Sequence, residues 1–257
     1  MDTTSDVVHR GIRERAATIV GSAGDVPLAL WTPEAAAPTG LVLVGHGGSG
    51  HKREDYVVAL ARRLVRTTGA AVASIDGPLH GGRRGARTMD PTVVLMEFAQ
   101  AWTSDEGLTD RMVADWRATL DALEGDAGLG RVPVGYWGLS MGTLLGLPFV
   151  AADARVRACV LGLAGRTGPT AHRLHEDAQR VVVPTLFLVQ LDDELFSTAS
   201  SLELFGDLAS ADKRLFAAPG RHREVPADAF WLSVDFLATH LELTGTAPEL
   251  LEEHGGA

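Results

Sequence analysis

One serine lies in a glycine-rich turn between a predicted strand and a predicted helix. Ser140 is at the centre of Gly138-Leu-Ser-Met-Gly142, which follows the apolar run 132–137 and precedes an apolar, helix-compatible segment. A G-x-S-x-G turn needs small residues on both sides, because its serine adopts a strained backbone conformation that leaves no room for neighbouring side chains. Such a turn exposes the Ser140 hydroxyl and places the Met141 amide at a helix N-terminus, where it can donate to a developing oxyanion.

A serine hydroxyl becomes a useful nucleophile only beside a base, and the base needs an orienting acid. The acid candidates Asp192, Asp193 and Glu194 follow one later predicted strand, and the base candidate His222 follows the last one. Alone, a carboxylate cluster or a loop histidine is more often a solvated surface group. Three suitable residue types at successive sites, in the chain order serine, acid, histidine, favour nucleophilic catalysis by Ser140.

The elements that position these residues alternate between strand and helix. Short apolar or alternating runs predict strands at 15–20, 26–31, 41–44, 70–75, 132–137, 156–163, 184–190 and 213–218. Apolar residues at helical spacing predict helices at 56–66, 110–123, 170–180, 202–208 and 230–243. This pattern predicts an α/β fold with a mostly parallel sheet of about eight strands, helices on both faces, and the site at the carboxyl ends of the strands.

Residues 84–109 interrupt the alternation with an apolar stretch. The segment leaves the tip of the strand that precedes Asp76, on the side of the sheet where Ser140 is expected. One interpretation is a short inserted lid that walls the substrate pocket; the alternatives are a helix packed on the body or a contact in a homodimer. The side chains expected at the pocket are Met96, Phe98 and Trp102 of this segment, together with His46 and His80 of two loops.

A competing interpretation starts from the loop Gly45-His-Gly-Gly-Ser-Gly50, which satisfies the G-x-G-x-x-G pattern of dinucleotide-binding (Rossmann-type) proteins. A charged connection follows the loop, and Asp76 comes later than the spacing of about 20 residues that the pattern requires. This interpretation also leaves the serine, acid and histidine candidates without a role. A non-catalytic binding protein on a hydrolase scaffold is the third hypothesis.

Composition narrows the class of protein. The chain of 257 residues has a formal net charge of −10, which argues against a nucleic-acid partner. It has one cysteine, Cys159, and no apolar run of about 18 residues, so we expect no disulfide within the chain and no membrane span. The polar N-terminus lacks a signal-peptide core, and we expect a cytoplasmic protein. His172 and His175 share a helix face without a third ligand, so no metal site is expected.

We expect one domain over residues 13–244, a loose or helical leader over 1–12 and a C-terminal tail over 245–257. The motifs of this domain resemble those of the α/β-hydrolase superfamily, and within it the single-domain serine esterases close to the dienelactone hydrolase and peptidase-like branch. The resemblance covers roughly residues 26–240. It rests on His46-Gly47-Gly48, Asp76-Gly-Pro-Leu-His-Gly81, Gly138-Leu-Ser-Met-Gly142, Asp193-Glu-Leu-Phe196 and Gly220-Arg-His222.

The resemblance implies the α/β-hydrolase fold, with Ser140 as nucleophile, Asp193 as orienting acid and His222 as general base. It favours Asp193 over Asp192 because family acids precede one variable residue and then two apolar ones, as Leu195 and Phe196 do here. By the same pattern, the amides of Gly48 and Met141 form the oxyanion hole.

The resemblance further implies hydrolysis of small carboxylic esters through an acyl-enzyme, without a cofactor. Dienelactone hydrolases carry a cysteine where this chain has Ser140, which favours ordinary esters over a dienelactone. A thioester or amide substrate stays open.

Overall fold

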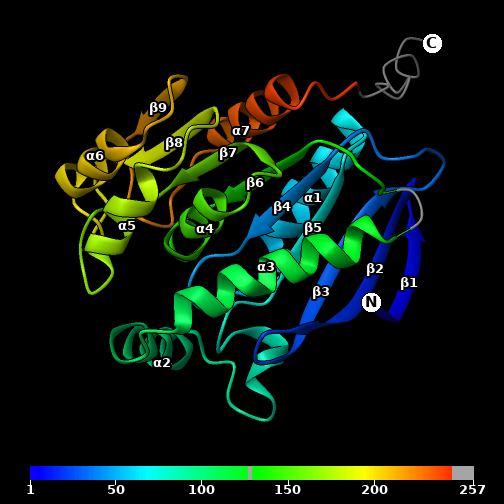
Figure 1. Cartoon of the computed structure of the whole chain (residues 1–257), viewed down its shortest axis with the longest axis horizontal. Coiled ribbons are helices and arrows are strands. Elements are labelled where there is room, and N and C mark those ends of the chain that lie inside the picture. Colours follow the sequence, from blue (N-terminus) through cyan, green and yellow to red (C-terminus); the bar gives the residue numbers. More distant parts are fainter. Residues whose placement is uncertain (127–128, 245–257) are drawn as a thin grey trace, which may run out of the picture.

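A nine-stranded sheet runs through the molecule (Figure 1). The computed structural model describes residues 1–126 and 129–244, so the expected tail over 245–257 lies outside the described residues. The strands are β1 (Asp2–His9), β2 (Ile12–Gly21), β3 (Gly24–Pro33), β4 (Leu41–Gly45), β5 (Ala71–Ile75), β6 (Val134–Gly138), β7 (Val156–Gly162), β8 (Thr185–Gln190) and β9 (Lys213–Ala218). Their spatial order is β1-β2-β3-β5-β4-β6-β7-β8-β9. Strands β4 to β9 pair in parallel, whereas β1, β2 and β3 pair antiparallel to one another and β3 pairs antiparallel to β5.

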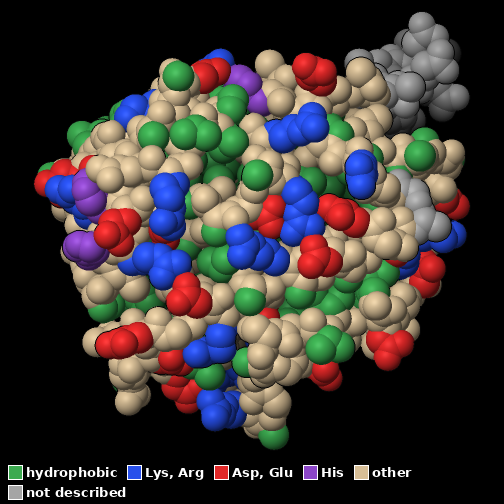
Figure 2. Space-filling model, in the orientation of Figure 1, with side chains coloured by type: hydrophobic (Ala, Val, Ile, Leu, Met, Phe, Trp, Pro, Cys, Tyr) green, Lys and Arg blue, Asp and Glu red, His purple; other side chains and the backbone are tan. Residues whose placement is uncertain are grey.

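Helices cover both faces of this sheet, as the alternating pattern predicts. They are α1 (Asp55–Thr68), the short 3₁₀ helix η1 (Gly81–Arg84), α2 (Pro91–Ser104), α3 (Leu108–Glu124), α4 (Met141–Ala152), α5 (Ala171–Ala178), α6 (Thr198–Asp207) and α7 (Ala227–His240). Helices α3, α4 and α5 lie on the near face in Figure 1, and α1 and α7 lie behind the sheet. Basic and acidic side chains are interspersed over the near face (Figure 2).

Each face of the sheet has its own hydrophobic core, because successive strand residues point to opposite sides. In β4, Leu43 packs in the core shared with Trp116 of α3, whereas Val44 packs in the core shared with Leu64 of α1. Every residue of β4 is buried. This burial on both faces explains why the strand is a continuous apolar run in the sequence.

The expectation of a loose or helical leader is wrong, because residues 2–9 form strand β1. This strand pairs antiparallel with β2, with Asp6 opposite Arg15. All of its side chains are exposed, so backbone hydrogen bonds rather than a buried apolar face hold it in place. A strand of this kind has no hydropathy signal; the signal that the sequence does contain is the tight turn at Arg10 and Gly11, where both residues have positive φ.

The segment that interrupts the alternation forms α2, which packs on the body of the protein. Its first turn is capped by the Asp90 carboxylate, which accepts a hydrogen bond from the Thr92 amide at 2.9 Å. The buried Phe98 ring lies 5.4 Å from the His80 ring, centroid to centroid, and stacks on Trp102 at 6.3 Å. The described helices include none that is long and apolar enough to cross a membrane.

Candidate active site

The turn between β6 and α4 places Ser140 in a strained conformation at the carboxyl end of the sheet. Its φ of 57° and ψ of −121° are rare for a residue with a side chain, and its amide donates to Gly162 O at 2.9 Å. A Cβ at Gly138 would lie 2.7 Å from Gly142 O, and one at Gly142 would lie 2.5 Å from Gly45 O. These approaches explain why glycine stands on both sides of the serine.

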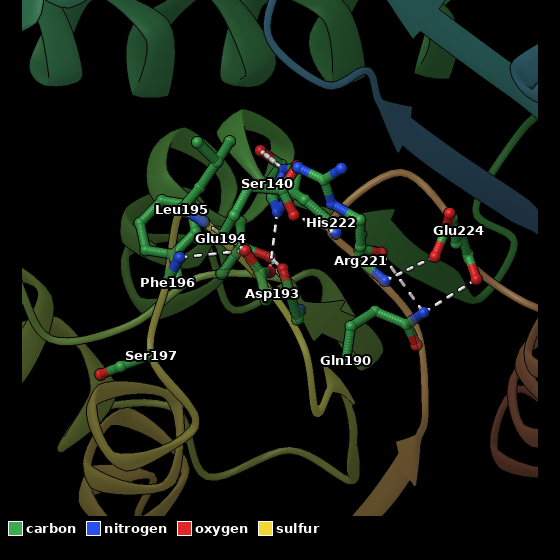
Figure 3. Close-up of polar contacts among 12 residues, drawn as sticks. Ser140, Gln190, Asp193, Glu194, Leu195, Phe196, Ser197, Arg221, His222 and Glu224 are labelled. Atoms are coloured by element: carbon green, nitrogen blue, oxygen red, sulfur yellow. Dashed lines mark hydrogen bonds and ion pairs between the residues drawn. The ribbon is translucent and has the colours of Figure 1, made fainter.

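Ser140, His222 and Asp193 point toward one another in a single hydrogen-bonded line (Figure 3). His222 Nε2 is 2.9 Å from Ser140 Oγ, and His222 Nδ1 is 2.7 Å from Asp193 Oδ2. Because the carboxylate accepts from Nδ1–H, the Nε2 lone pair faces the serine hydroxyl. The side chains of His222 and Asp193 are 10% and 3% exposed, so little water competes for these bonds. The arrangement can transfer a proton from Ser140 as the serine attacks.

All three candidate acids contact the histidine loop, but only Asp193 contacts the imidazole. Asp192 Oδ2 accepts from the Gly220 amide at 3.1 Å, and Glu194 Oε2 accepts from the His222 amide at 3.0 Å. The hydrogen bond from the His222 amide lowers the pKa of Glu194 below its ordinary value. The geometry therefore gives Asp193 the orienting position and makes its two neighbours supports of the loop backbone.

A second network fixes the turns around the acid and the base. Asp193 Oδ1 accepts from the amides of Leu195 at 2.7 Å and Phe196 at 3.0 Å, which orients the carboxylate toward His222. At the end of β8, the side-chain Nε2 of Gln190 donates to the backbone oxygen of Glu224 in the histidine loop at 2.8 Å (Figure 3). The loops after β8 and β9 are thus joined at several points besides the catalytic pair.

Two backbone amides near Ser140 are available to a ligand. Among the described residues, the amides of Gly48 and Met141 have no protein acceptor. Met141 is the first residue of α4, and Gly48 lines the same cavity as Ser140. Unpaired amides at a helix N-terminus and in a glycine loop can stabilise an oxyanion.

The cavity beside Ser140 has a volume of about 340 Å³ and an apolar wall. Trp137 and Phe230 stack at 5.8 Å between ring centroids, and Tyr56 lies 6.1 Å from Trp137. Burial raises the pKa of Tyr56 to about 12, so its hydroxyl is neutral. The lining residues are Gly47, Gly48, Gly50, Glu54, Tyr56, Trp137, Leu139, Ser140, Leu163, His222, Arg223, Val225 and Phe230.

The five side chains expected at the pocket lie elsewhere among the described residues. None of them is in the lining of this cavity, which does not support their assignment to the substrate pocket. Met96 is 67% exposed, whereas Phe98 is buried in the core on one face of the sheet and Trp102 packs partly buried against that core. His46 and His80 are buried in the loops after β4 and β5, where both accept hydrogen bonds from backbone amides. The lid role of residues 84–109 stays a prediction.

Sequence reasoning missed the aromatic wall of the cavity. Tyr56 and Phe230 belong to the first turns of α1 and α7, and Trp137 belongs to the strand before the serine. Their only sequence signal is that each aromatic residue stands close to a loop at the carboxyl end of the sheet. Hydropathy assigns such aromatic residues to the hydrophobic core. It carries no information about where that core encloses a cavity.

The dinucleotide interpretation does not fit the structure of its two marker regions. The buried Asp76 carboxylate accepts from Lys52 Nζ at 2.7 Å, from the Lys52 amide at 2.9 Å and from the Gly82 amide at 2.8 Å. It is therefore occupied and cannot bind a ribose hydroxyl. Helix α1 begins only at Asp55, so the Gly45–Gly50 loop does not present a helix N-terminus to a pyrophosphate.

The two histidines of α5 contact different carboxylates. His172 Nδ1 lies 3.4 Å from Glu176, and His175 Nδ1 lies 3.0 Å from Asp207. Within residues 1–126 and 129–244, no group of three or more His, Cys, Asp or Glu side chains is arranged to hold a metal ion.

Comparison with known proteins gave matches among solved structures. A search of protein-family profiles found no match, and a search of curated sequences also found none. A PEG-bound complex of a cold-adapted esterase from an Arctic intertidal metagenomic library is 39% identical, with a TM-score of 0.83, over 92% of this chain and 97% of that chain. A native structure of a cold-adapted esterase from such a library is 35% identical, with a TM-score of 0.80, over 94% and 100% of the two chains. Dienelactone hydrolase from Anabaena variabilis ATCC 29413 is 20% identical over 90% of this chain and 99% of that one, and its TM-score of 0.66 shows a shared fold.

Proposed function

Because the chain belongs to the α/β-hydrolase superfamily of serine esterases and is a carboxylic ester hydrolase, we propose that it cleaves small esters through an acyl-enzyme on Ser140. The observation that carries this proposal is the line of hydrogen bonds from Ser140 Oγ through the His222 ring to Asp193, at 2.9 Å and 2.7 Å. It joins a strained serine to a base and an acid in the order that nucleophilic catalysis requires.

In the first half of the reaction, Ser140 Oγ attacks the ester carbonyl as His222 Nε2 takes its proton. Asp193 holds the imidazole in the required tautomer and stabilises the positive charge that it gains. The carbonyl oxygen becomes an oxyanion, to which the amides of Gly48 and Met141 donate. His222 then gives the proton to the leaving alcohol, and the acyl group stays on Ser140.

Water completes the cycle by the same route. His222 takes a proton from a water molecule that attacks the acyl-enzyme, the oxyanion forms again between the same two amides, and Ser140 leaves with the proton. Besides the ester and water, every group that these steps need belongs to the chain itself, so the proposed reaction uses no cofactor.

The cavity beside Ser140 supports a proposal for the size and polarity of one half of the substrate. Its volume of about 340 Å³ and its aromatic wall favour an apolar group of moderate size on one side of the scissile bond. Glu54 and Arg223 give its lining one group of each charge. The proposal is therefore an esterase for small substrates with at least one apolar group.

Turnover of p-nitrophenyl acetate, butyrate and octanoate by wild type and by Ser140→Ala tests this function. We expect the variant to lose about 10⁴-fold or more in kcat while its melting temperature is unchanged. Ser104→Ala is the matched control, since Ser104 lies at the end of α2 with its hydroxyl bonded to Gln100 O at 2.9 Å. A Ser140→Ala variant that keeps more than a tenth of the wild-type turnover would overturn the proposal.

A further inference from the structure

Three successive amides of the loop after β4 have different partners. The Gly47 amide donates to the Tyr56 hydroxyl oxygen at 2.6 Å, and the Ser49 amide donates to His80 Nε2 at 3.1 Å. Between them, the Gly48 amide has no acceptor among the described residues. Protein acceptors therefore bind both neighbours of the amide that the proposed mechanism gives to the oxyanion.

Ser49 is held in a conformation that it would not choose alone. Its φ of 65° lies in the left-handed region, which is unfavourable for a residue with a Cβ. Such a conformation persists only where the surroundings fix it. Two hydrogen bonds fix it in this loop: the Gly50 amide donates to Gly47 O at 3.3 Å and closes the turn, and the Ser49 amide donates to the completely buried His80. If the His80 acceptor were lost, Ser49 could relax to an ordinary φ. The peptide plane between Gly48 and Ser49 would then turn, and the Gly48 amide, which belongs to the preceding peptide unit, would shift with it.

His80 is itself held with the correct ring nitrogen toward Ser49. Its Nδ1 lies 2.7 Å from Pro78 O, so Nδ1 carries the hydrogen and Nε2 has the free lone pair. The Phe98 ring packs edge-on against it at 5.4 Å, and the His46 ring lies 5.2 Å away. Burial lowers the pKa of His80 below the ordinary histidine value, which keeps the acceptor unprotonated at neutral pH.

The far end of the same loop has an anchor of its own. The Lys52 ammonium and amide both bond to the buried Asp76 carboxylate, at 2.7 Å and 2.9 Å. Burial raises the pKa of the Asp76 carboxyl. The charge and hydrogen bonds of Lys52 counteract this effect and the pKa is lowered overall, so the carboxylate stays ionised. Lys52 is fixed at one end of the loop and Gly47 at the other, and the Gly50 amide closes the turn between them on Gly47 O. His80 is the side chain that binds the central amide of this turn, that of Ser49.

We propose that His80 is a positioning residue for ester hydrolysis: its Nε2 lone pair binds the Ser49 amide, holds the left-handed turn and thereby aims the Gly48 amide at the oxyanion. The inference rests on the proposed function of Ser140 and Gly48. His80 then acts by positioning a hydrogen-bond donor for the transition state. The sequence had instead suggested that His80 forms part of the wall of the substrate pocket.

The role has a kinetic signature. An oxyanion donor acts on charge that develops only in the transition state, so its displacement lowers kcat and leaves KM nearly unchanged. A pocket residue would instead change KM or the preference among substrates. Affinity for phenylboronic acid, which forms a tetrahedral adduct with a catalytic serine, should fall together with kcat.

Two variants of His80 separate its two hydrogen bonds. In His80→Gln the side-chain oxygen can reach the position of Nε2 and accept from Ser49, whereas in His80→Asn the shorter amide can reach only the position of Nδ1 and donate to Pro78. We expect His80→Asn to lower kcat by about 10- to 100-fold, somewhat less than the removal of an oxyanion donor. We expect His80→Gln to recover most of that loss.

The controls separate this role from stability and from the proposed function. Thr68→Val removes a buried hydrogen bond to Leu64 O far from the site, and it should lower the melting temperature without changing kcat. If His80→Asn has wild-type kcat, changes only KM, or loses no more than His80→Gln, the positioning role is wrong. If Ser140→Ala stays active, the proposed function fails, whatever the His80 variants do.

A measurement on the wild-type protein covers the case in which His80→Asn does not fold. Nitrogen-15 NMR of the histidine rings, with the His80 signal assigned by its loss in His80→Gln, reports which ring nitrogen carries the hydrogen. We expect the Nδ1–H form at neutral pH. An Nε2–H form would leave no acceptor for Ser49 and would overturn the proposal.

Discussion

The catalytic loops and the cavity beside them are built by different interactions. In the loops, Ser140, Asp193 and His222 are held by directional hydrogen bonds of 2.7–3.0 Å. In the cavity, rings such as those of Trp137 and Phe230 are held by stacking and burial. A hydrogen-bonded site tolerates little displacement, whereas an apolar wall can be reshaped one side chain at a time. Substitution of the hydrogen-bonded catalytic side chains should therefore cost orders of magnitude in rate, and substitutions in the cavity should mainly change substrate preference.

The largest effect short of losing the serine is expected at the acid. Asp193→Asn should lower kcat by about 10⁴-fold, because an amide at this position stabilises the wrong histidine tautomer. Steady-state turnover of p-nitrophenyl butyrate measures the loss.

The neighbours of Asp193 are the matched controls. Asp192→Asn and Glu194→Gln each remove only a contact to the backbone of the histidine loop, so their losses should be much smaller. An inactive Asp192→Asn beside an active Asp193→Asn would reverse the assignment of the acid.

A change in the cavity should alter selectivity. Phe230→Ala enlarges the space beside Trp137 and should raise the turnover of octanoate relative to acetate esters. We expect a shift of about 10- to 200-fold, which is typical for a change in an apolar pocket. Values of kcat/KM over a series of chain lengths provide the test, and an unchanged profile would mean that this cavity does not hold the substrate.

Protonation should affect the hydrogen-bonded loops. Burial lowers the pKa of His46 from 6.5 to about 3, and its Nε2 accepts from the Gly77 amide at 2.9 Å. As the pH falls, His46 is therefore protonated in the unfolded chain before it is protonated in the folded protein. The stabilisation from neutral His46 is complete above pH 6.5 and is lost as the pH falls toward 3. Between pH 7 and pH 5 the free energy of unfolding should fall by about 2 kcal/mol from this group.

Urea unfolding of wild type and His46→Gln at the two pH values isolates this contribution. The variant should lose less stability on acidification than wild type does. Equal losses in both proteins would show that His46 is not the group responsible.

The smallest kinetic effects are expected in α2. Phe98→Ala should lower the free energy of unfolding by about 3–5 kcal/mol, because Phe98 is buried between His80 and Trp102. Met96→Ala should change stability by less than about 0.5 kcal/mol, since Met96 is 67% exposed. We expect both variants, and Trp102→Ala, to keep the wild-type preference among chain lengths.

The same chain-length series used for Phe230→Ala tests the lid interpretation of residues 84–109. A change in preference for Met96→Ala or Trp102→Ala comparable to that of Phe230→Ala would show that α2 walls the substrate after all. Helix α2, like the aromatic wall of the cavity, would then contribute to substrate preference.

Local chemistry explains what the sequence could predict. The turn around Ser140 demands glycine at fixed positions, and parallel strands bring the residues that follow them to one edge, so the strands, most helices and the serine, acid and histidine candidates could be predicted. The strand β1 could not, because its side chains are all exposed and leave no hydropathy pattern.

Tertiary packing explains what the sequence could not predict. The place of Tyr56 and Phe230 in a cavity depends on how two helices sit behind the sheet, which no local pattern specifies. The contact of His80 with Ser49 joins loops after two different strands, so the sequence shows the histidine but not its partner.

The central claim is that Ser140 is the nucleophile, and covalent labelling tests it most directly. Wild-type protein treated with a fluorophosphonate and digested should carry the adduct on Ser140, in proportion to the activity that is lost. The Ser140→Ala variant should take up no label, because its reactive oxygen is missing. Complete loss of esterase activity with the adduct on any other residue, or an unlabelled Ser140 in fully inhibited protein, would contradict the account.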